Sequence, residues 1–245
     1  MRIARGRYAL PGAAEDRQKA NELSATLCLD SAARYFGWKL KHQPAGPALA
    51  VRRKRHLTAE QRKGVRIVYV DLADEDLSSD GWATSHIRTV MDCASRLPFD
   101  EALAVADSAI RAGDVTPSEL VAAAGKMPDR YRTRCSRVAA CADGRAANPF
   151  ESVLRAIAED VPGLCIEPQV SIEQIGRWDL ADEKLRLAVE AESFEFHGQR
   201  WHLKHDCERY NAFVIAGWVV CGSPGSTSCS NPSTCARSSA ESSSG

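Results

Sequence analysis

One segment near the carboxyl end, residues 177–192, restricts the fold more than any other part of the chain. Arg177 to Ala181 has the composition of a short strand, and Asp182-Glu183-Lys184 is a polar turn. Leu185 to Glu192 then alternates apolar and polar residues. Alternation with a period of two is typical of a half-buried strand, so the segment predicts a β-hairpin.

Acidic side chains mark one side of this predicted hairpin. Glu190 and Glu192 are two residues apart, so on a strand they point to the same side. Asp179 comes from the partner strand. A wide turn places Asp179 opposite Glu190, whereas a tight two-residue turn places it opposite Arg186, and both registers stay open.

Three carboxylates around one point suit a hard cation. Mg²⁺ takes carboxylate and water ligands, generates a nucleophilic hydroxide and neutralises charge on a phosphate. Asp179, Glu190 and Glu192 therefore predict a Mg²⁺ site for phosphodiester cleavage, and the simpler alternative is a polar outer strand face. Glu151 lies three residues after Asn148, so it is either a capping-box glutamate or an additional ligand or base.

The elements around the hairpin predict a small α/β unit with a mixed sheet flanked by helices. They are a helix from Asn148 to Ile157, a strand from Ile166 to Ile172, a helix from Leu203 to Ala216 closed by Gly217, and a strand from Trp218 to Val220.

The region before this unit is predicted to be mainly helical, and it contains no cluster of catalytic residue types. Thr116, Pro117 and Glu119 form a strong helix start. We interpret residues 76–145 as a connecting region with helices at Ser85 to Ala94, Phe99 to Arg111, Pro117 to Ala124 and Arg130 to Cys141.

The first 75 residues form a basic region. Residues 1–70 hold 15 Lys and Arg against 5 Asp and Glu. Two helices (Ala13 to Leu27, Asp30 to Phe36) and two strands (Ala48 to Arg53, Val65 to Val70) are compatible with a winged helix-turn-helix. The cluster Arg52, Arg53, Lys54 and Arg55 either contacts a phosphate backbone or docks onto the acidic residues 71–130.

Nothing in the sequence predicts export or a membrane span, because no apolar run is long enough for either. Nine scattered cysteines are typical of reduced thiols in a cytoplasmic protein. The group His197, His202, His205 and Cys207 matches no common zinc spacing. His197 is instead a candidate phosphate contact or proton carrier. Further candidate phosphate contacts, which could equally be a solvated helix face, are Arg200, Lys204 and Arg209.

Four stretches together resemble a known family. They are Asn148-Pro-Phe-Glu-Ser-Val-Leu-Arg, Arg177-Trp-Asp-Leu-Ala-Asp, Val189-Glu-Ala-Glu-Ser-Phe-Glu-Phe-His-Gly, and Asp206-Cys-Glu-Arg-Tyr-Asn with the later Ala-Gly-Trp-Val-Val. The set is similar to the domain of unknown function family 559. That family is related to very-short-patch-repair endonucleases with the PD-(D/E)xK restriction-endonuclease-like fold. Residues 20–145 resemble an actinobacterial branch with an abortive-infection-antitoxin-like amino-terminal region.

The resemblance implies roles for individual residues. Asp179 matches the metal-binding aspartate, Glu190 the first acid of a Glu-x-Asp pair, and Glu151 the helix glutamate. Glu192 stands where that pair usually has Asp. His197, Asp206 and Arg209 match further motif positions, and the usual active-site lysine is missing.

The carboxyl end departs from the family. Members continue into Leu-Arg-Phe-Ser-Trp-Glu-His-Val-Met, whereas this chain continues from Cys221 as Cys-Gly-Ser-Pro-Gly-Ser-Thr-Ser. The codons CTG CGG TTC TCC TGG GAG CAC GTC ATG encode the family peptide. Read from the second base, the same codons encode Cys-Gly-Ser-Pro-Gly-Ser-Thr-Ser. We therefore expect a frameshift at Val220 or Cys221 and a disordered Ser-rich tail over 221–245.

These observations predict a winged-helix-like region (1–75), a helical connecting region (76–145), a nuclease-like domain (146–220) and the tail. The predicted function is Mg²⁺-dependent hydrolysis of DNA phosphodiester bonds. One alternative is a DNA-binding regulator or antitoxin of a toxin–antitoxin system, with a protein partner and a non-catalytic nuclease fold. Another is an inactive frameshifted product.

Overall fold

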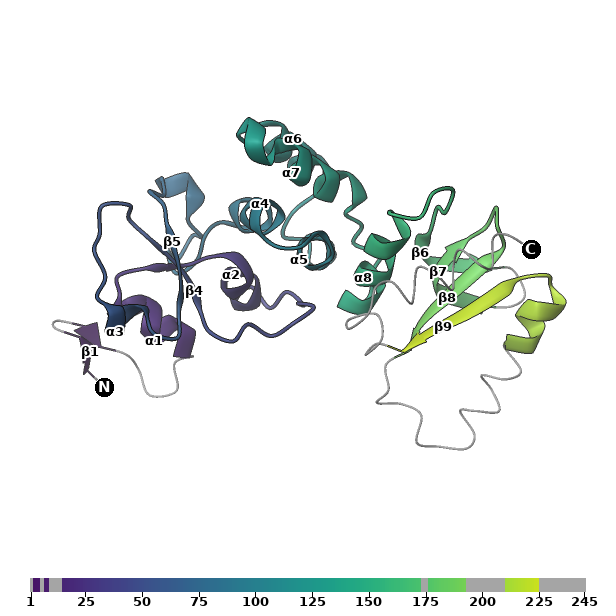
Figure 1. Cartoon of the computed structure of the whole chain (residues 1–245), viewed down its shortest axis with the longest axis horizontal. Helices are drawn as coiled ribbons and strands as arrows, with labels where there is room; N and C mark the ends of the chain where they lie inside the picture. The colour runs from purple at the N-terminus through teal and green to yellow at the C-terminus, as the bar shows by residue number, and fades with distance from the viewer. Residues whose placement is uncertain (1, 5–6, 9–14, 173–175, 193–209, 225–245) are drawn as a thin grey trace. The chain divides into compact units, whose positions relative to one another are not determined.

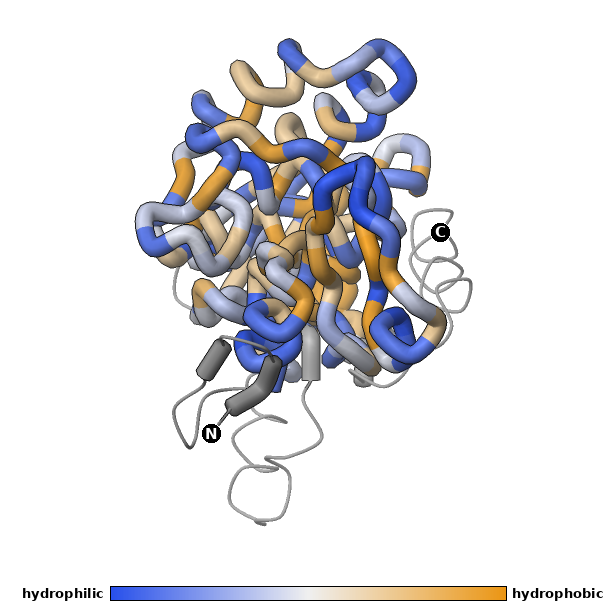
Figure 2. The backbone as a smooth tube through the Cα atoms, turned by 90° about the vertical axis from the view of Figure 1, so that its left-hand side faces the viewer, coloured by the Kyte–Doolittle hydropathy of each residue, from blue (hydrophilic) through white to orange (hydrophobic). Residues whose placement is uncertain are grey.

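The structure, a computed structural model, describes residues 2–4, 7–8, 15–172, 176–192 and 210–224. The chain divides into two compact units, Met1–Ala142 (unit 1) and Asp143–Gly245 (unit 2). Each contains a small mixed sheet with helices, which confirms the predicted α/β class (Figure 1). Figure 2 shows how hydrophobic (orange) and hydrophilic (blue) stretches alternate along the backbone.

Unit 1 begins with short strands and helices around a three-stranded sheet of order β3-β4-β5. The elements are β1 (Arg2–Ala4), β2 (Arg7–Tyr8), α1 (Glu15–Glu22), β3 (Thr26–Leu27), α2 (Leu29–Tyr35), β4 (Ala48–Val51), α3 (Ala59–Arg62) and β5 (Arg66–Tyr69). The central strand β4 is buried at all four positions, as expected for an apolar strand paired on both edges.

Two predictions for this region need correction. The first helix ends at Glu22 and not at Leu27, because Thr26 and Leu27 pair with Ala50 and Leu49 in the sheet. The second concerns the strand pair expected to form a wing. β4 and β5 pair in parallel, and the crossover that connects them contains α3. A wing, by contrast, is an antiparallel hairpin. This pair therefore does not form a wing.

The rest of unit 1 is helical, close to the predicted bounds. After the 3₁₀ turn η1 (Asp74–Asp76) follow α4 (His86–Arg96), α5 (Phe99–Arg111), α6 (Pro117–Gly125) and α7 (Asp129–Cys141). The buried face of α5 includes Ala102, Ala106 and Ala109, at the three- and four-residue spacing of a helix packed on a core. Thr116 and Glu119 form the predicted capping box of α6.

Unit 2 contains α8 (Pro149–Ala158) and a sheet of order β6-β7-β8-β9. The strands are β6 (Glu167–Ile172), β7 (Gly176–Asp182), β8 (Leu187–Glu192) and β9 (Val219–Pro224). β6, β7 and β8 pair antiparallel, and β9 joins β8 in parallel. Of the helix predicted from Leu203, the structure describes a helical segment at 210–215, and Gly217 follows it with φ +80°.

Two apolar clusters lie on opposite faces of this sheet. Leu180, Leu187 and Val189 pack with Leu154 of α8. Ala188, which must point the other way on its strand, packs with Trp178 and with Phe213 of the segment 210–215. The sheet is thus covered by a helix on each face, as Figure 1 shows.

The strand β9 is longer than the sequence predicts. It runs through Cys221 and Gly222 to Pro224, into the stretch expected to be disordered. β9 is an edge strand, where backbone hydrogen bonds to one neighbour suffice for pairing, so its side chains need not be apolar. Residues 225–245, the rest of the predicted tail, lie outside the described residues.

Candidate functional site

The candidate site of unit 2 begins at the amino end of α8. Asn148 is the N-cap: its Oδ1 accepts hydrogen bonds from the backbone N–H of Phe150 (2.8 Å) and of Glu151 (3.1 Å). Its Nδ2 also donates to Oε1 of Glu151 (2.8 Å), and the N–H of Ala147 donates to Oε2 (2.9 Å). The cap therefore also holds the carboxylate of Glu151, which is only 1% exposed.

Gln169 connects this carboxylate to the hairpin. Its Nε2 donates to Oε2 of Glu151 (2.8 Å) and lies 3.5 Å from Oδ1 of Asp179. Its Oε1 accepts a hydrogen bond from Nε of Arg177. One amide thus joins an acid from α8 to an acid from β7. The φ of Gln169 is +56°, a left-handed conformation that is uncommon in a strand and is often found at functional sites.

The register of the hairpin follows the wide-turn alternative. Asp182 pairs with Leu187 and Leu180 pairs with Val189. Asp179 and Glu190 are therefore the next residues on the two strands, and pairing of Asp179 with Arg186 is excluded. Oδ1 of Asp182 accepts the N–H groups of Lys184 and Leu185, both at 3.0 Å, which closes the turn that sets this register.

Glu190 has a partner that the sequence did not suggest. The hydroxyl of Tyr210 donates to its Oε2 at 2.6 Å. Tyr210 also packs against Trp178, on the sheet face opposite to α8. The structure therefore brings Glu151 and Asp179 together through Gln169 and holds Glu190 from the other side of the sheet.

The described acidic side chains of the site, Glu151, Asp179 and Glu190, do not form a complete metal centre. Among the residues that the structure describes, no three side chains of the His, Cys, Asp or Glu type are grouped closely enough to hold a metal ion. The backbone of Glu192 lies in β8, but its side chain lies outside the described part of the chain. The other predicted residues of this region lie wholly outside the described residues: His197, Arg200, Lys204, Asp206 and Arg209.

The basic segment of unit 1 is largely exposed. Arg52, Arg53 and Lys54 form a turn after β4, and their side chains make no ion pair with any residue in the described ranges. Arg55 differs, because its guanidinium donates to the carbonyl oxygens of Leu23 and Ser24. Three of the four basic residues of this cluster are therefore accessible, and Arg55 has a structural role.

Three residues of the site were missed by the sequence analysis: Gln169, Tyr210 and Asp182. Gln169 stands among the polar positions of an alternating strand, which is a weak signal. Tyr210 lies within the predicted helix from Leu203 to Ala216 and was given no role of its own. Asp182 was placed in a turn, but its burial, at 2% exposure, was not foreseen.

Comparisons with known proteins do not reveal a function. No protein-family model matches the chain. Two proteins of Mycobacterium tuberculosis, one from each of two strains and both named only as uncharacterized, are 29% identical to it over 205 residues. The match covers 80% of this chain and 73% of each relative.

A solved structure shows a weaker likeness. The crystal structure of the RV2827C protein from Mycobacterium tuberculosis is similar with a TM-score of 0.38 and 16% sequence identity. The likeness covers 54% of this chain and 52% of that one, so it spans about half of the solved chain. In the parts of the chain with described structure, no helix has the length and apolar composition needed to cross a membrane.

Proposed function

We propose that unit 2 is a nuclease-like domain that hydrolyses DNA phosphodiester bonds with the help of Mg²⁺. The observation that supports this most is the link made by Gln169, which joins the buried Glu151 of α8 to Asp179 of β7. Glu190 follows on the neighbouring strand. Glu151 and Asp179 come together here, and Glu190 is held by Tyr210 instead. An acid on the helix and an acid on each of two strands of one sheet are what the resemblance to the PD-(D/E)xK fold implies.

The donor chemistry fits Mg²⁺, although the ligand set is incomplete among the described side chains. Mg²⁺ prefers oxygen ligands and is commonly bound by one or two carboxylates, with water and substrate phosphates completing its shell. We assign Asp179 and Glu190 as ligands, with Glu192 as the third. When bound, the ion would lower the pKa of a coordinated water and neutralise charge on the phosphate.

The chain's own residues would then hold and orient this site. Gln169 and Asn148 keep Glu151 fixed, and Gln169 orients Asp179 toward the same point. Tyr210 fixes the carboxylate of Glu190. His197 is proposed to carry protons. Arg52, Arg53 and Lys54, with the predicted contacts Arg200, Lys204 and Arg209, would supply affinity for DNA that does not depend on sequence. We propose the cytoplasm as the compartment.

Metal-dependent cleavage tests this function. Purified chain is incubated with plasmid or single-stranded DNA in Mg²⁺ or in EDTA. We expect cleavage only with Mg²⁺ and a loss of about 100-fold or more in Asp179→Asn, since charge at the phosphate is then no longer stabilised. Asp129→Asn, at a side chain that is 90% exposed, is the matched control. Cleavage that persists in EDTA or in Asp179→Asn would refute the proposal.

The exposed basic turn favours a second candidate, a DNA-binding regulator or antitoxin whose unit 2 is not catalytic. It predicts salt-sensitive DNA binding without cleavage, which survives Asp179→Asn and is lost when Arg52, Arg53 and Lys54 are all changed to Ala. The third candidate, an inactive frameshifted product, predicts that a version with the family reading frame restored after Val220 cleaves DNA and the present chain does not.

A further inference from the structure

A cavity in unit 1 is not used by the proposed function. Its volume is about 620 Å³, within the range of small-molecule sites. It is lined by residues of α4, α6 and α7 together with residues near β5 and η1. Its apolar lining includes Ile87, Met91, Met127 and Tyr131, which offer broad surfaces to a flat ring.

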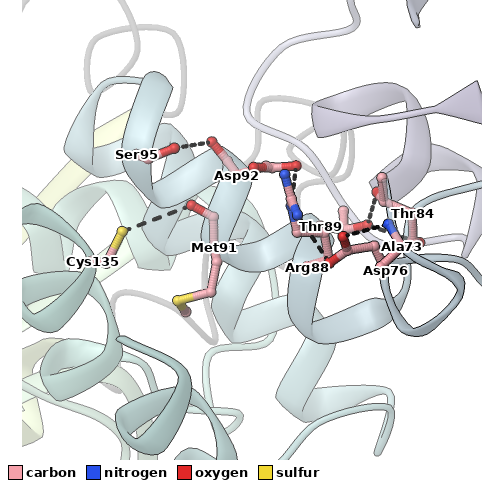
Figure 3. A network of polar contacts seen from close by, with 9 residues as sticks. All are labelled: Ala73, Asp76, Thr84, Arg88, Thr89, Met91, Asp92, Ser95 and Cys135. Carbon is pink, nitrogen blue, oxygen red and sulfur yellow. Dashed lines mark hydrogen bonds and ion pairs between the residues drawn. The ribbon is translucent and has the colours of Figure 1, made fainter. Parts of the chain in front are cut away.

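Acidic groups joined by one arginine line the same cavity (Figure 3). Arg88 of α4 donates from Nε to Oδ2 of Asp92 and from a terminal nitrogen to Oδ1 of Asp76, both at 2.9 Å. Oδ2 of Asp76 accepts the N–H of Ala73 at 3.1 Å, so both oxygens of Asp76 are used.

Asp92 retains an unused acceptor. Its side chain is only 10% exposed, and burial raises its pKa even though Arg88 works to lower it. Oδ1 of Asp92 makes no hydrogen bond to any residue for which the structure gives a position. An oxygen of a largely buried carboxylate that lines a cavity and has no protein donor is a site for an N–H group of a ligand.

The exposed residues that line the cavity include four cations and the two acids Glu75 and Glu119. Arg53, Arg96, Lys126 and Arg130 are all exposed, and none of them forms an ion pair within the described ranges. The guanidinium of Arg130 lies 4.6 Å from the ring centroid of its neighbour Tyr131. Several unpaired cations beside an apolar surface suit a ligand with a multiply charged anionic group.

We propose that this cavity binds a mononucleotide whose base carries an amino group. The base lies against Met91, Met127 and Tyr131, and its amino group donates to Oδ1 of Asp92. The phosphate contacts Arg96, Lys126 and Arg130. An inorganic phosphate would leave most of the cavity and the acceptor on Asp92 unused, and a simple amine would leave the cations unused.

The proposal can be tested by measuring nucleotide binding to the full chain by calorimetry in EDTA. The nucleotides are compared in pairs in which one member has an amino group on the base and the other does not. The pairs are AMP with purine riboside 5′-monophosphate, GMP with IMP, and CMP with UMP. We expect at least one amino-bearing nucleotide to bind, and its partner without the amino group to bind about tenfold more weakly, because Oδ1 of Asp92 then stays unsatisfied. Equal binding within every pair, no nucleotide binding, or binding of inorganic phosphate as tight as that of the nucleotides would overturn the proposal.

A variant at an exposed cation tests the phosphate contact without endangering the fold. Lys126→Ala should weaken binding of the same nucleotide about fivefold or more, since a charge-assisted contact is lost. Lys39→Ala, at an exposed lysine that does not line the cavity, should bind like the unmodified chain. Equal effects of the two substitutions would contradict the assignment. Asp179→Asn should bind nucleotide normally, which separates this proposal from the one for unit 2.

Discussion

The two units each bring two acidic side chains together, but they join them differently. In unit 1 the guanidinium of Arg88 lies between Asp76 and Asp92, so a fixed positive charge compensates the carboxylates. In unit 2 the neutral amide of Gln169 lies between Glu151 and Asp179. A fixed cation compensates the charge of an acidic pair, whereas the amide of Gln169 adds no charge of its own to Glu151 and Asp179.

The largest expected effect comes from removing the fixed cation in unit 1. Arg88→Met leaves Asp76 and the buried Asp92 without their shared partner, and we expect unit 1 to lose about 3 kcal/mol of stability at pH 7. Urea unfolding followed by circular dichroism measures this. Arg132→Ala, whose side chain is 50% exposed, should change stability by less than about 0.5 kcal/mol.

The loss of stability in Arg88→Met should depend on pH, and the direction of that dependence can be derived. Burial raises the pKa of Asp92, and loss of Arg88 removes the group that lowers it. A carboxyl whose pKa is raised in the folded state favours folding at low pH and loses that contribution as the pH rises through the folded pKa. The difference in unfolding free energy between the unmodified chain and Arg88→Met should therefore become smaller as the pH falls. A deficit that grows toward acid would contradict the assigned network.

The two helix caps provide the next comparison. Thr116 caps the exposed start of α6, where Oγ1 accepts the N–H of Glu119 (3.3 Å), so Thr116→Ala should cost about 1 kcal/mol. Asn148→Ala should cost about 2 kcal/mol, because Glu151 loses a hydrogen bond in a buried position as well. It should also reduce Mg²⁺-dependent cleavage, which Thr116→Ala leaves unchanged. Equal losses of stability in the two variants would show that the cap of α8 does not support Glu151.

The neutral bridge itself can be removed. Gln169→Leu should destabilise unit 2 by about 1.5 kcal/mol, because Glu151 and Asp179 lose their common donor. The proposed Mg²⁺ site requires that Mg²⁺ raise the thermal stability of the unmodified chain, and Gln169→Leu should reduce that rise. Ser171→Ala, at an exposed position of the same strand, is the control. If Mg²⁺ stabilises both variants equally, Gln169 does not orient the metal ligands.

The smallest effect is expected at the start of unit 2. Burial works to raise the pKa of Asp143, but hydrogen bonds from Arg145 and its positive charge outweigh burial and lower the pKa. Arg145 is 53% exposed, so solvent weakens the pair and Asp143→Asn should cost less than about 1 kcal/mol at pH 7. A carboxyl group whose pKa is lowered in the folded state stabilises the fold at pH values above its unfolded pKa of about 4. This contribution is lost as the pH falls through the folded pKa. Acid titration of both proteins should show their stabilities converging below pH of about 4.

Much of the fold could be predicted because its signals are local. The capping residues Thr116 and Asn148 marked the starts of α6 and α8, and the bounds of α5 were predicted as observed. Caps and helical periodicity depend on residues only a few positions apart. Pairing partners depend on distant residues instead. The sequence therefore predicted β4 and β5 as strands but not their parallel pairing, and it placed the end of α1 too late.

The candidate site shows the same division. The sequence by itself determined which side chains are acidic, and the alternation along β8 placed Glu190 and Glu192 on one side of that strand. The tertiary structure decided the register of the hairpin, the hydrogen bonds of Gln169 to Glu151 and Asp179, and the contact of Tyr210 with Glu190. The physical reason is that alternation depends only on the geometry of one strand, whereas these contacts form only when segments distant in the chain pack against each other.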